Sequence, residues 1–566
     1  MIALVAIALS VALAAAPIPA ASPALQAALE AELVRTTAMK LPDASAPYLV
    51  LYDALDGNVA DSVAEDGALV TSTFERYRNV RTEVRVGDYT VDSSNFSGFG
   101  EPDGVETRRL PLEDDPVALR REVWLSTDSA YKHAVETLSH KLAARRGQQE
   151  PPPPDYQRTP PVTIGASAHP GTAFSGEEVS DLARALSGAA SIPGVEAAQA
   201  EVRDWHGWRL LVGSEGTRAW TPTGNIVVRV EATVRRADGV EVRDARWWVG
   251  RDAADFPSMA TLTAEASAMA TALVALAAAP DPTPWLGPVL FEGPAAAELF
   301  SQLLAPEFVG TRPEEQDDHG AGSPEPPTAR IGRRLLPLGW SAWDDPTTTT
   351  GAGGEYTLDH EGVAPRRVDL VADGVLKDVL MSRIPSKVRA ASTGHGRGLG
   401  SDRRGALPGF VHVAAPKLSS VKQLRKQALK LAKAVGSDSV LVIQRLQPPA
   451  MVQQLDVAFS GEGPLSGLTA PYEACRLYAD GRCESVRNLR FVGVDRRALR
   501  DIVGAAAGAG PIDMLDGPPG PQRYLIGATG GVPTTWDVPS VLLSEMELDA
   551  AASGEPRVLK IERVTP

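Results

Sequence analysis

The sequence predicts an α+β protein in which an N-terminal α/β region with antiparallel strands precedes a mainly β C-terminal domain. Helical patterns and alternating apolar–polar runs share the first half of the chain. From Pro284 onward, Gly, Pro and short apolar runs prevail, which is typical of a β-rich domain with many turns. The 566 residues suffice for two or three domains, and 43% hydrophobic with 22% charged residues is ordinary for a globular protein.

The N-terminus carries a predicted export signal. Residues Met1 to Ala16 are continuously apolar or small. We predict a signal peptide over residues 1–21, because the run is shorter than the roughly 20 apolar residues that span a bilayer. The small residues Ala14–Ala16 offer one cleavage site, and a cut near Ala20 or Ala21 is the alternative. The alternative is a buried N-terminal helix. No later segment is predicted to span a membrane, so we expect an exported protein, periplasmic or extracellular, without a membrane span after signal removal.

Residues 22–146 are predicted to form the first part of the N-terminal region. Their apolar spacing predicts a helix over Pro23–Thr37, strands over Tyr48–Tyr52 and Val80–Val86, and a charge-rich helix over about Pro116–Arg145. Pro23 suits the first helical position, because its missing N–H would have no partner there.

Residues 147–165 are predicted to be a semi-rigid linker, because they contain four consecutive prolines, Pro151–Pro154. Residues 166–282 form the second part of the N-terminal region. Their predicted elements are strands over Trp208–Val212, Ile226–Val234 and Val242–Val249, and an Ala-rich helix over about Met259–Ala278.

Residues 283–566 are predicted to form the β-rich C-terminal domain. One helix interrupts its strands, with Ser419 or Ser420 as the N-cap and an apolar stripe from Val421 to Val435. The acidic, proline-containing segment Arg312–Ala329 is predicted to be an exposed flexible loop.

The chain contains two cysteines, Cys475 and Cys483, which flank an Asp-Gly turn signal at Asp480 and Gly481. In an exported protein this pair can close a disulfide across a hairpin. Closure requires that the two residues fall opposite each other, with Cα atoms about 5.5–6 Å apart. Two free structural thiols are the alternative.

Three stretches of the C-terminal half carry a resemblance to a known family. They are Gly287–Phe300; Asp359–Gly362 with Asp373–Asp378 and Ser392–Arg397; and Val486–Phe491 with Ala498–Ile502. In this order and spacing they resemble the TldD/PmbA family, the metallopeptidase-related proteins also called modulators of DNA gyrase. The resemblance covers roughly Trp285 to Leu548 and implies the family's fold. The net charge of −15 argues against a nucleic-acid partner, which weakens a literal reading of the gyrase name.

The resemblance also shows a departure at the family's metal site. In the peptidase branch, a His-Glu-x-x-x-His helix and a later Cys hold zinc, and the Glu activates the metal-bound water. The matching positions here are Ser301, Gln302 and Pro306, and Pro306 is expected to break or end the helix. The region of the expected Cys, around Met514–Gly520, contains none. We therefore expect no catalytic residue, metal or other cofactor at this position.

This departure resembles the PmbA (TldE) branch, whose members share the fold and lack the metal motif. The resemblance implies a non-catalytic protein of peptide proteolysis or maturation that shapes a common peptide channel. Its expected partners are a TldD-like metal-bearing subunit or a second copy of the chain, and a peptide ligand.

The segment Gly394-His395-Gly396-Arg397 is a candidate binding loop. It fits neither a dinucleotide fingerprint nor a P-loop. The resemblance implies that its glycines let the backbone approach the central channel, with His395 and Arg397 near a bound peptide. A tight Gly-rich turn without a ligand is the alternative.

Two other function classes stay open. His133, Glu136 and His140 share one helix face and can supply a relocated metal site for an active metallopeptidase, although a solvated helix face is the bland interpretation. The other class is a non-enzymatic envelope module that binds peptide or glycan.

Overall fold

The computed structural model describes residues 18–550 except 43, 98–103, 147–151, 280–282, 317–326, 399–402, 448–466, 487 and 517–530. The predicted signal segment therefore lies almost wholly outside the described residues. Where the description begins, the chain contacts the N-terminal sheet, because the indole N–H of Trp208 donates to the carbonyl of Pro19 at 3.0 Å.

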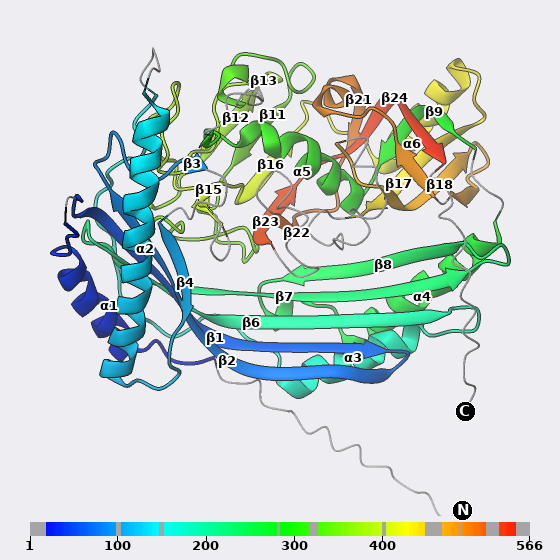
Figure 1. Cartoon of the computed structure of the whole chain (residues 1–566). Helices are drawn as coiled ribbons and strands as arrows, with labels where there is room; N and C mark the ends of the chain where they lie inside the picture. The colour runs from blue at the N-terminus through cyan, green and yellow to red at the C-terminus, as the bar shows by residue number, and fades with distance from the viewer. Residues whose placement is uncertain are drawn as a thin grey trace, which may run out of the picture.

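One seven-stranded sheet forms the base of the N-terminal region, so the two predicted parts of that region are a single layer (Figure 1). All its pairs are antiparallel except the one between β5 and β7. The strands, in sheet order, are β4 (Val105–Arg109), β2 (Ala68–Val86), β1 (Pro47–Glu65), β6 (Ala197–Gly213), β7 (Arg218–Arg235) and β5 (Thr163–Ile164), with β8 (Glu241–Gly250) also on β7.

The central strands are much longer than the sequence indicated. The prediction of a strand over Tyr48–Tyr52 was wrong in extent, because β1 continues for 19 residues. It turns into β2 at Asp66 and Gly67, whose φ angles of 49° and 84° are those of a tight hairpin turn.

Two pairs of helices cover the two ends of this sheet (Figure 1). The helices α1 (Pro23–Thr36) and α2 (Pro116–Ala144) share one apolar core with the sheet, and α3 (Gly176–Ala190) and α4 (Met259–Ala278) share another. The sequence did not predict α3, which a capping box of Ser175 and Glu178 starts.

The Ala-rich helix α4 bears on the prediction that no later segment spans a membrane. By length and composition it is long and apolar enough to cross a bilayer, with a mean hydropathy of 1.4. The model places one face of α4 against α3 and the sheet, where Leu262, Met269 and Leu273 are buried. A helix that buries one face within a protein can have the same length and hydropathy as a membrane span.

The C-terminal domain contains two larger sheets with the helix α5 (Pro294–Phe308) between them. The six-stranded sheet runs β13 (Val375–Leu376), β12 (Val368–Ala372), β11 (Ser341–Asp344), β16 (Phe410–Ala414), β23 (Val532–Asp537) and β22 (Ile512–Asp516). The seven-stranded sheet runs β19 (Cys483–Val486), β18 (Pro471–Tyr478), β17 (Ser439–Leu446), β9 (Trp285–Phe291), β24 (Ser540–Ala550) and β20 (Leu489–Phe491), with β21 (Ile502–Ala506) also on β24.

Smaller elements complete the fold. The predicted amphipathic helix is α6 (Val421–Ala434), which Ser420 caps and which packs on the seven-stranded sheet. Two short strand pairs are β3 (Phe96–Ser97) with β10 (Glu315–Gln316), and β14 (Gly396–Arg397) with β15 (Gly405–Ala406). The pair of β3 with β10 ties the N-terminal region to the predicted loop Arg312–Ala329, so the start of that segment is not free.

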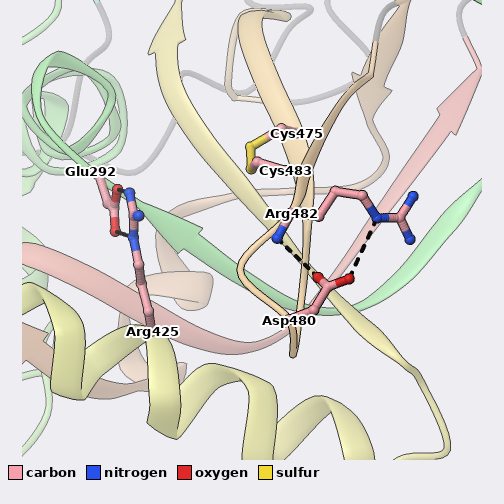
Figure 2. Close-up of a disulfide and its surroundings, with 6 residues drawn as sticks. All are labelled: Glu292, Arg425, Cys475, Asp480, Arg482 and Cys483. Atoms are coloured by element: carbon pink, nitrogen blue, oxygen red, sulfur yellow. Dashed lines mark hydrogen bonds and ion pairs between the residues drawn. A yellow bond between two sulfur atoms is a disulfide. The ribbon is translucent and has the colours of Figure 1, made fainter.

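Cys475 and Cys483 are bonded in the structure, with Cα atoms 5.5 Å apart (Figure 2). The sequence argument required the two residues to lie directly opposite each other, and they do not. Cys475 pairs with Ser485 and Cys483 with Leu477, so the bond is diagonal across the β18–β19 hairpin.

We expect the double variant Cys475→Ser/Cys483→Ser to lose about 2 kcal/mol of unfolding free energy, because the bond closes a short loop in the unfolded chain. Urea titration followed by circular dichroism measures this loss. The unsubstituted protein with dithiothreitol should show the same shift, and an unchanged midpoint in both would contradict the expectation.

Candidate functional site

Helix α5 is the element that carries the matching positions of the zinc motif. It begins at Pro294 after Gly293, whose φ of 55° is readily adopted by glycine. Nearly all of its residues are buried, so the helix is enclosed by the domain on every face. The helix continues to Phe308, so the prediction that Pro306 breaks it was wrong. Pro306 lies in the last turn, where few hydrogen bonds depend on it.

The side-chain amide of Gln302 forms two hydrogen bonds with the segment before β18. Its Nε2 donates to the hydroxyl of Thr469 at 2.9 Å, and its Oε1 accepts from the backbone N–H of Thr469 at 2.8 Å. Both ends of the amide are therefore used within the protein. Ser301 is buried beside it. Glu307, one turn later, pairs with Arg330 at 2.6 Å and lies 3.5 Å from Arg496.

A cavity of about 700 Å³ opens at the start of α5, and we call it the α5 cavity. It lies between β8 of the N-terminal sheet and the C-terminal domain. Its wall includes Trp247 and Trp248 of β8, Glu298 of α5, Arg445 of β17 and Met514 of β22. This volume is within the range of small-ligand and peptide-side-chain pockets.

Glu298 is the buried acid of the α5 cavity. It is 2% exposed, and one carboxylate oxygen accepts from the backbone N–H of Leu446 at 2.6 Å. Burial raises the pKa of Glu298 well above its usual range, although the nearby Arg445 opposes this shift. The carboxyl group can therefore bind as a neutral hydrogen-bond donor or, once ionised, as the partner of a cation.

The candidate loop residues His395 and Arg397 lie elsewhere and are buried. The ring of His395 is 0% exposed, with Nδ1 against Thr393 and Nε2 3.3 Å from Asp344. Its nitrogens are therefore occupied, and the expectation of His395 at a ligand has no support. Gly394 has a φ of 75°, and the Cα of Gly396 packs so close to Glu361 that a side chain would clash. These glycines serve a close turn, which was the alternative interpretation. Arg397 alone of the four borders a cavity.

Residues 286–460 match the model of the PmbA/TldA metallopeptidase C-terminal domain. No curated protein sequence matches the chain. This match assigns residues 286–460 to the TldD/PmbA family.

Solved structures show that the whole fold is shared. A Thermotoga maritima protein described as a candidate modulator of a DNA gyrase has 16% identity and a TM-score of 0.55 over 88% of this chain and 96% of its own. TldE from Thermococcus kodakarensis has 13% identity and a TM-score of 0.52 over 89% of this chain and 97% of its own. A Bacteroides thetaiotaomicron protein, also described as a candidate gyrase modulator, has 10% identity and a TM-score of 0.53 over 93% and 98%.

The metal ligands of the TldD/PmbA peptidase branch have no counterpart at the matching positions. Ser301, Gln302 and Pro306 stand where two histidines and a glutamate are expected, and residues 517–520 of the region of the expected Cys lie outside the described part. Among the described residues, no group of three or more His, Cys, Asp or Glu side chains could hold a metal ion. His133, Glu136 and His140 on α2 are among these residues, so the relocated site has no structural support.

We expect Gln302→Ala to lower the free energy of unfolding by about 1–3 kcal/mol, because it leaves the buried polar groups of Thr469 without their partner. Thermal unfolding measures the loss. Gln199→Ala, at an exposed glutamine that contacts Glu65, is the matched control and should change little. Equal small effects of both substitutions would remove Gln302 as a structural residue.

Proposed function

We propose that this chain is an exported, metal-free TldD/PmbA-type protein that binds peptide and acts in proteolysis or maturation beside a metal-bearing subunit. The observation that carries the proposal is the use of Gln302, at the position of the family's catalytic Glu, as a structural bridge to Thr469. A residue that donates and accepts within the core is unavailable to activate a water molecule.

The α5 cavity supports the peptide-binding part of the proposal. It lies beside the helix that would carry the metal motif, and its wall combines indole rings with charged groups. Such walls bind peptide side chains through stacking and hydrogen bonds together. The position of Glu298, with one oxygen held by Leu446, provides a fixed polar contact within this wall.

Export is supported by the apolar N-terminal run and by the disulfide between Cys475 and Cys483. Disulfides persist in oxidising compartments and are rare in the cytosol. Cell fractionation with an antibody to the chain tests this directly. Recovery of the protein in the cytosol with both thiols alkylatable would remove the export assignment.

A pull-down with the tagged full-length chain tests the partner role. We expect it to recover a relative that carries His-Glu-x-x-x-His, and we expect peptide hydrolysis from the mixture that neither protein alone reproduces. A Trp247→Ala variant should weaken hydrolysis by the mixture while leaving recovery of the relative unchanged. Chelator-sensitive hydrolysis by this chain alone would overturn the proposal.

The non-enzymatic binding module is the second candidate, because the α5 cavity serves it equally well. The same pull-down separates the two. Recovery of peptide or glycan without any metal-bearing relative would favour the binding module.

A further inference from the structure

A second cavity, of about 610 Å³, lies between the middle of the N-terminal sheet and the loops of the C-terminal domain. We call it the Arg209 cavity. Its wall includes Arg209 of β6, Thr221 and Thr223 near the start of β7, and Arg251 directly after β8. The C-terminal domain adds Glu355, His360 and Arg397. None of these residues belongs to the wall of the α5 cavity.

The charged groups of this wall are mostly cationic. The wall includes three guanidinium groups, those of Arg209, Arg251 and Arg397, and one carboxylate, that of Glu355. Glu355 is engaged within its own loop, where it accepts from the hydroxyl of Thr348 at 2.8 Å and from the backbone N–H of Gly351 at 3.0 Å. It is therefore not the counter-ion of the arginines. This local surplus contrasts with the net charge of −15 for the whole chain.

Arg209 presents the best-placed donors. The residue is 8% exposed, and its Nε lies 3.1 Å from Oδ1 of Asp53. Asp53 is shared, because the guanidinium of Arg404 lies 2.5 Å from its other oxygen. The two terminal nitrogens of Arg209 have no partner among the described residues. A buried guanidinium with two open terminal nitrogens matches the two oxygens of one carboxylate.

Arg397 and His360 are two further groups of this wall that interact electrostatically with Arg209. Arg397 donates to the carbonyls of Pro408 at 2.7 Å and Pro533 at 2.8 Å, which satisfy its hydrogen bonds without neutralising it. Burial lowers the pKa of Arg397, and the carboxylates of Asp344 and Asp359 oppose this shift. The pKa of His360 lies well below its usual range. Burial is the largest cause, and the positive charges of Arg209, Arg404 and Arg397 lower it further.

We propose that the Arg209 cavity binds a carboxylate, with Arg209 as the bidentate partner and with Thr221, Thr223 and Arg251 as further donors. The ligand is a short peptide with a free C-terminus or a small organic acid, since both present the same group. A carboxylate is favoured over phosphate because one guanidinium with open terminal nitrogens complements a single negative charge. This site goes beyond the proposed function, because it requires neither a metal-bearing partner nor the α5 cavity.

Calorimetric titration of the full-length chain tests the proposal with four probes: N-acetylated tetra-alanine with a free C-terminus, its C-terminal amide, acetate and inorganic phosphate. We expect the free acid to bind at least about tenfold more tightly than the amide, the scale of a charge-assisted hydrogen-bond pair. Binding of acetate as tight as that of the peptide acid would identify the organic acid as the source. Binding of acetate much weaker than the peptide acid would identify the peptide.

Arg209→Gln should abolish the preference for the free acid. Arg251→Gln should weaken binding of the free acid as well. This variant retains the pair of Arg209 with Asp53, so it tests the site even if Arg209→Gln misfolds. Arg184→Gln, at an exposed arginine of α3 that pairs with Asp181, is the matched control and should bind as the parent does. Equal binding of acid and amide, preferential binding of phosphate, no binding of any probe, or an unchanged preference in folded Arg209→Gln would overturn the proposal.

Discussion

Asp155→Ala is expected to lower the free energy of unfolding by about 3–5 kcal/mol, the cost of leaving buried cations without their carboxylate. Asp155 is fully buried. Its oxygens lie 2.7 Å from the ammonium of Lys141 and 3.4 Å from Arg145, and they also accept from Arg312. The cluster joins α2, the linker and the segment after α5, so both regions of the molecule depend on it.

The physical reason lies with Lys141. Its ammonium is also fully buried, and burial is the largest effect on its pKa, which is lowered despite the attraction of Asp155. Removal of the carboxylate leaves this buried ammonium either to remain charged without its ion-pair partner or to lose its proton. Either outcome reduces stability.

Urea unfolding monitored by tryptophan fluorescence measures this effect. The matched control is Asp128→Ala, which removes a solvent-accessible partner of Lys132 on the same helix and should cost well under about 1 kcal/mol. A loss below that level in Asp155→Ala would show that the cluster does not stabilise the fold.

Arg445→Ala is the second substitution with a large expected effect, a loss of about 3–5 kcal/mol in the free energy of unfolding. Arg445 of β17 reaches the N-terminal sheet, where its terminal nitrogens lie 2.9 and 3.1 Å from the two oxygens of Asp244 on β8. Asp244 is 7% exposed, and burial raises its pKa even with Arg445 present. Arg445→Lys should lose less, because one ammonium keeps the charge but not the bidentate geometry.

The pH dependence of this loss has a defined sign. Without Arg445, the folded-state pKa of Asp244 rises further above its unfolded value of about 3.9. A carboxyl with a raised folded pKa contributes less stability as the pH rises through the interval between these two values. The variant should therefore be more destabilised at pH 8 than at pH 5, and Arg445→Ala/Asp244→Ala should recover part of the loss. A pH-independent loss, with no recovery in the double variant, would contradict this account.

The fold class and most helices were predictable because their signals are local. Apolar periodicity and Pro23 located α1, and a serine cap located α6. The lengths of β1 and β2 were not predicted, although Asp66-Gly67 between them is a hairpin turn signal in the sequence. The capping box of Ser175 was likewise available to sequence reasoning and would have located α3.

The candidate site divides in the same way. Local motif spacing placed Ser301 and Gln302 on a helix, as the structure shows, but neither the burial of that helix nor its continuation through Pro306 was predicted. The Arg209 cavity could not be predicted, because Arg209 and His360 lie far apart in sequence and meet only across the domain interface. For the same reason Arg312 was predicted in an exposed loop, although its guanidinium contacts the buried Asp155.

The most direct test of this account is the metal content of the purified full-length chain, measured by inductively coupled plasma mass spectrometry after incubation with zinc and dialysis. We predict zinc far below one equivalent per chain, both in the parent protein and in His133→Ala. One tightly bound zinc per chain in the parent, whether or not His133→Ala removes it, would contradict the assignment of a family fold without the family's metal chemistry.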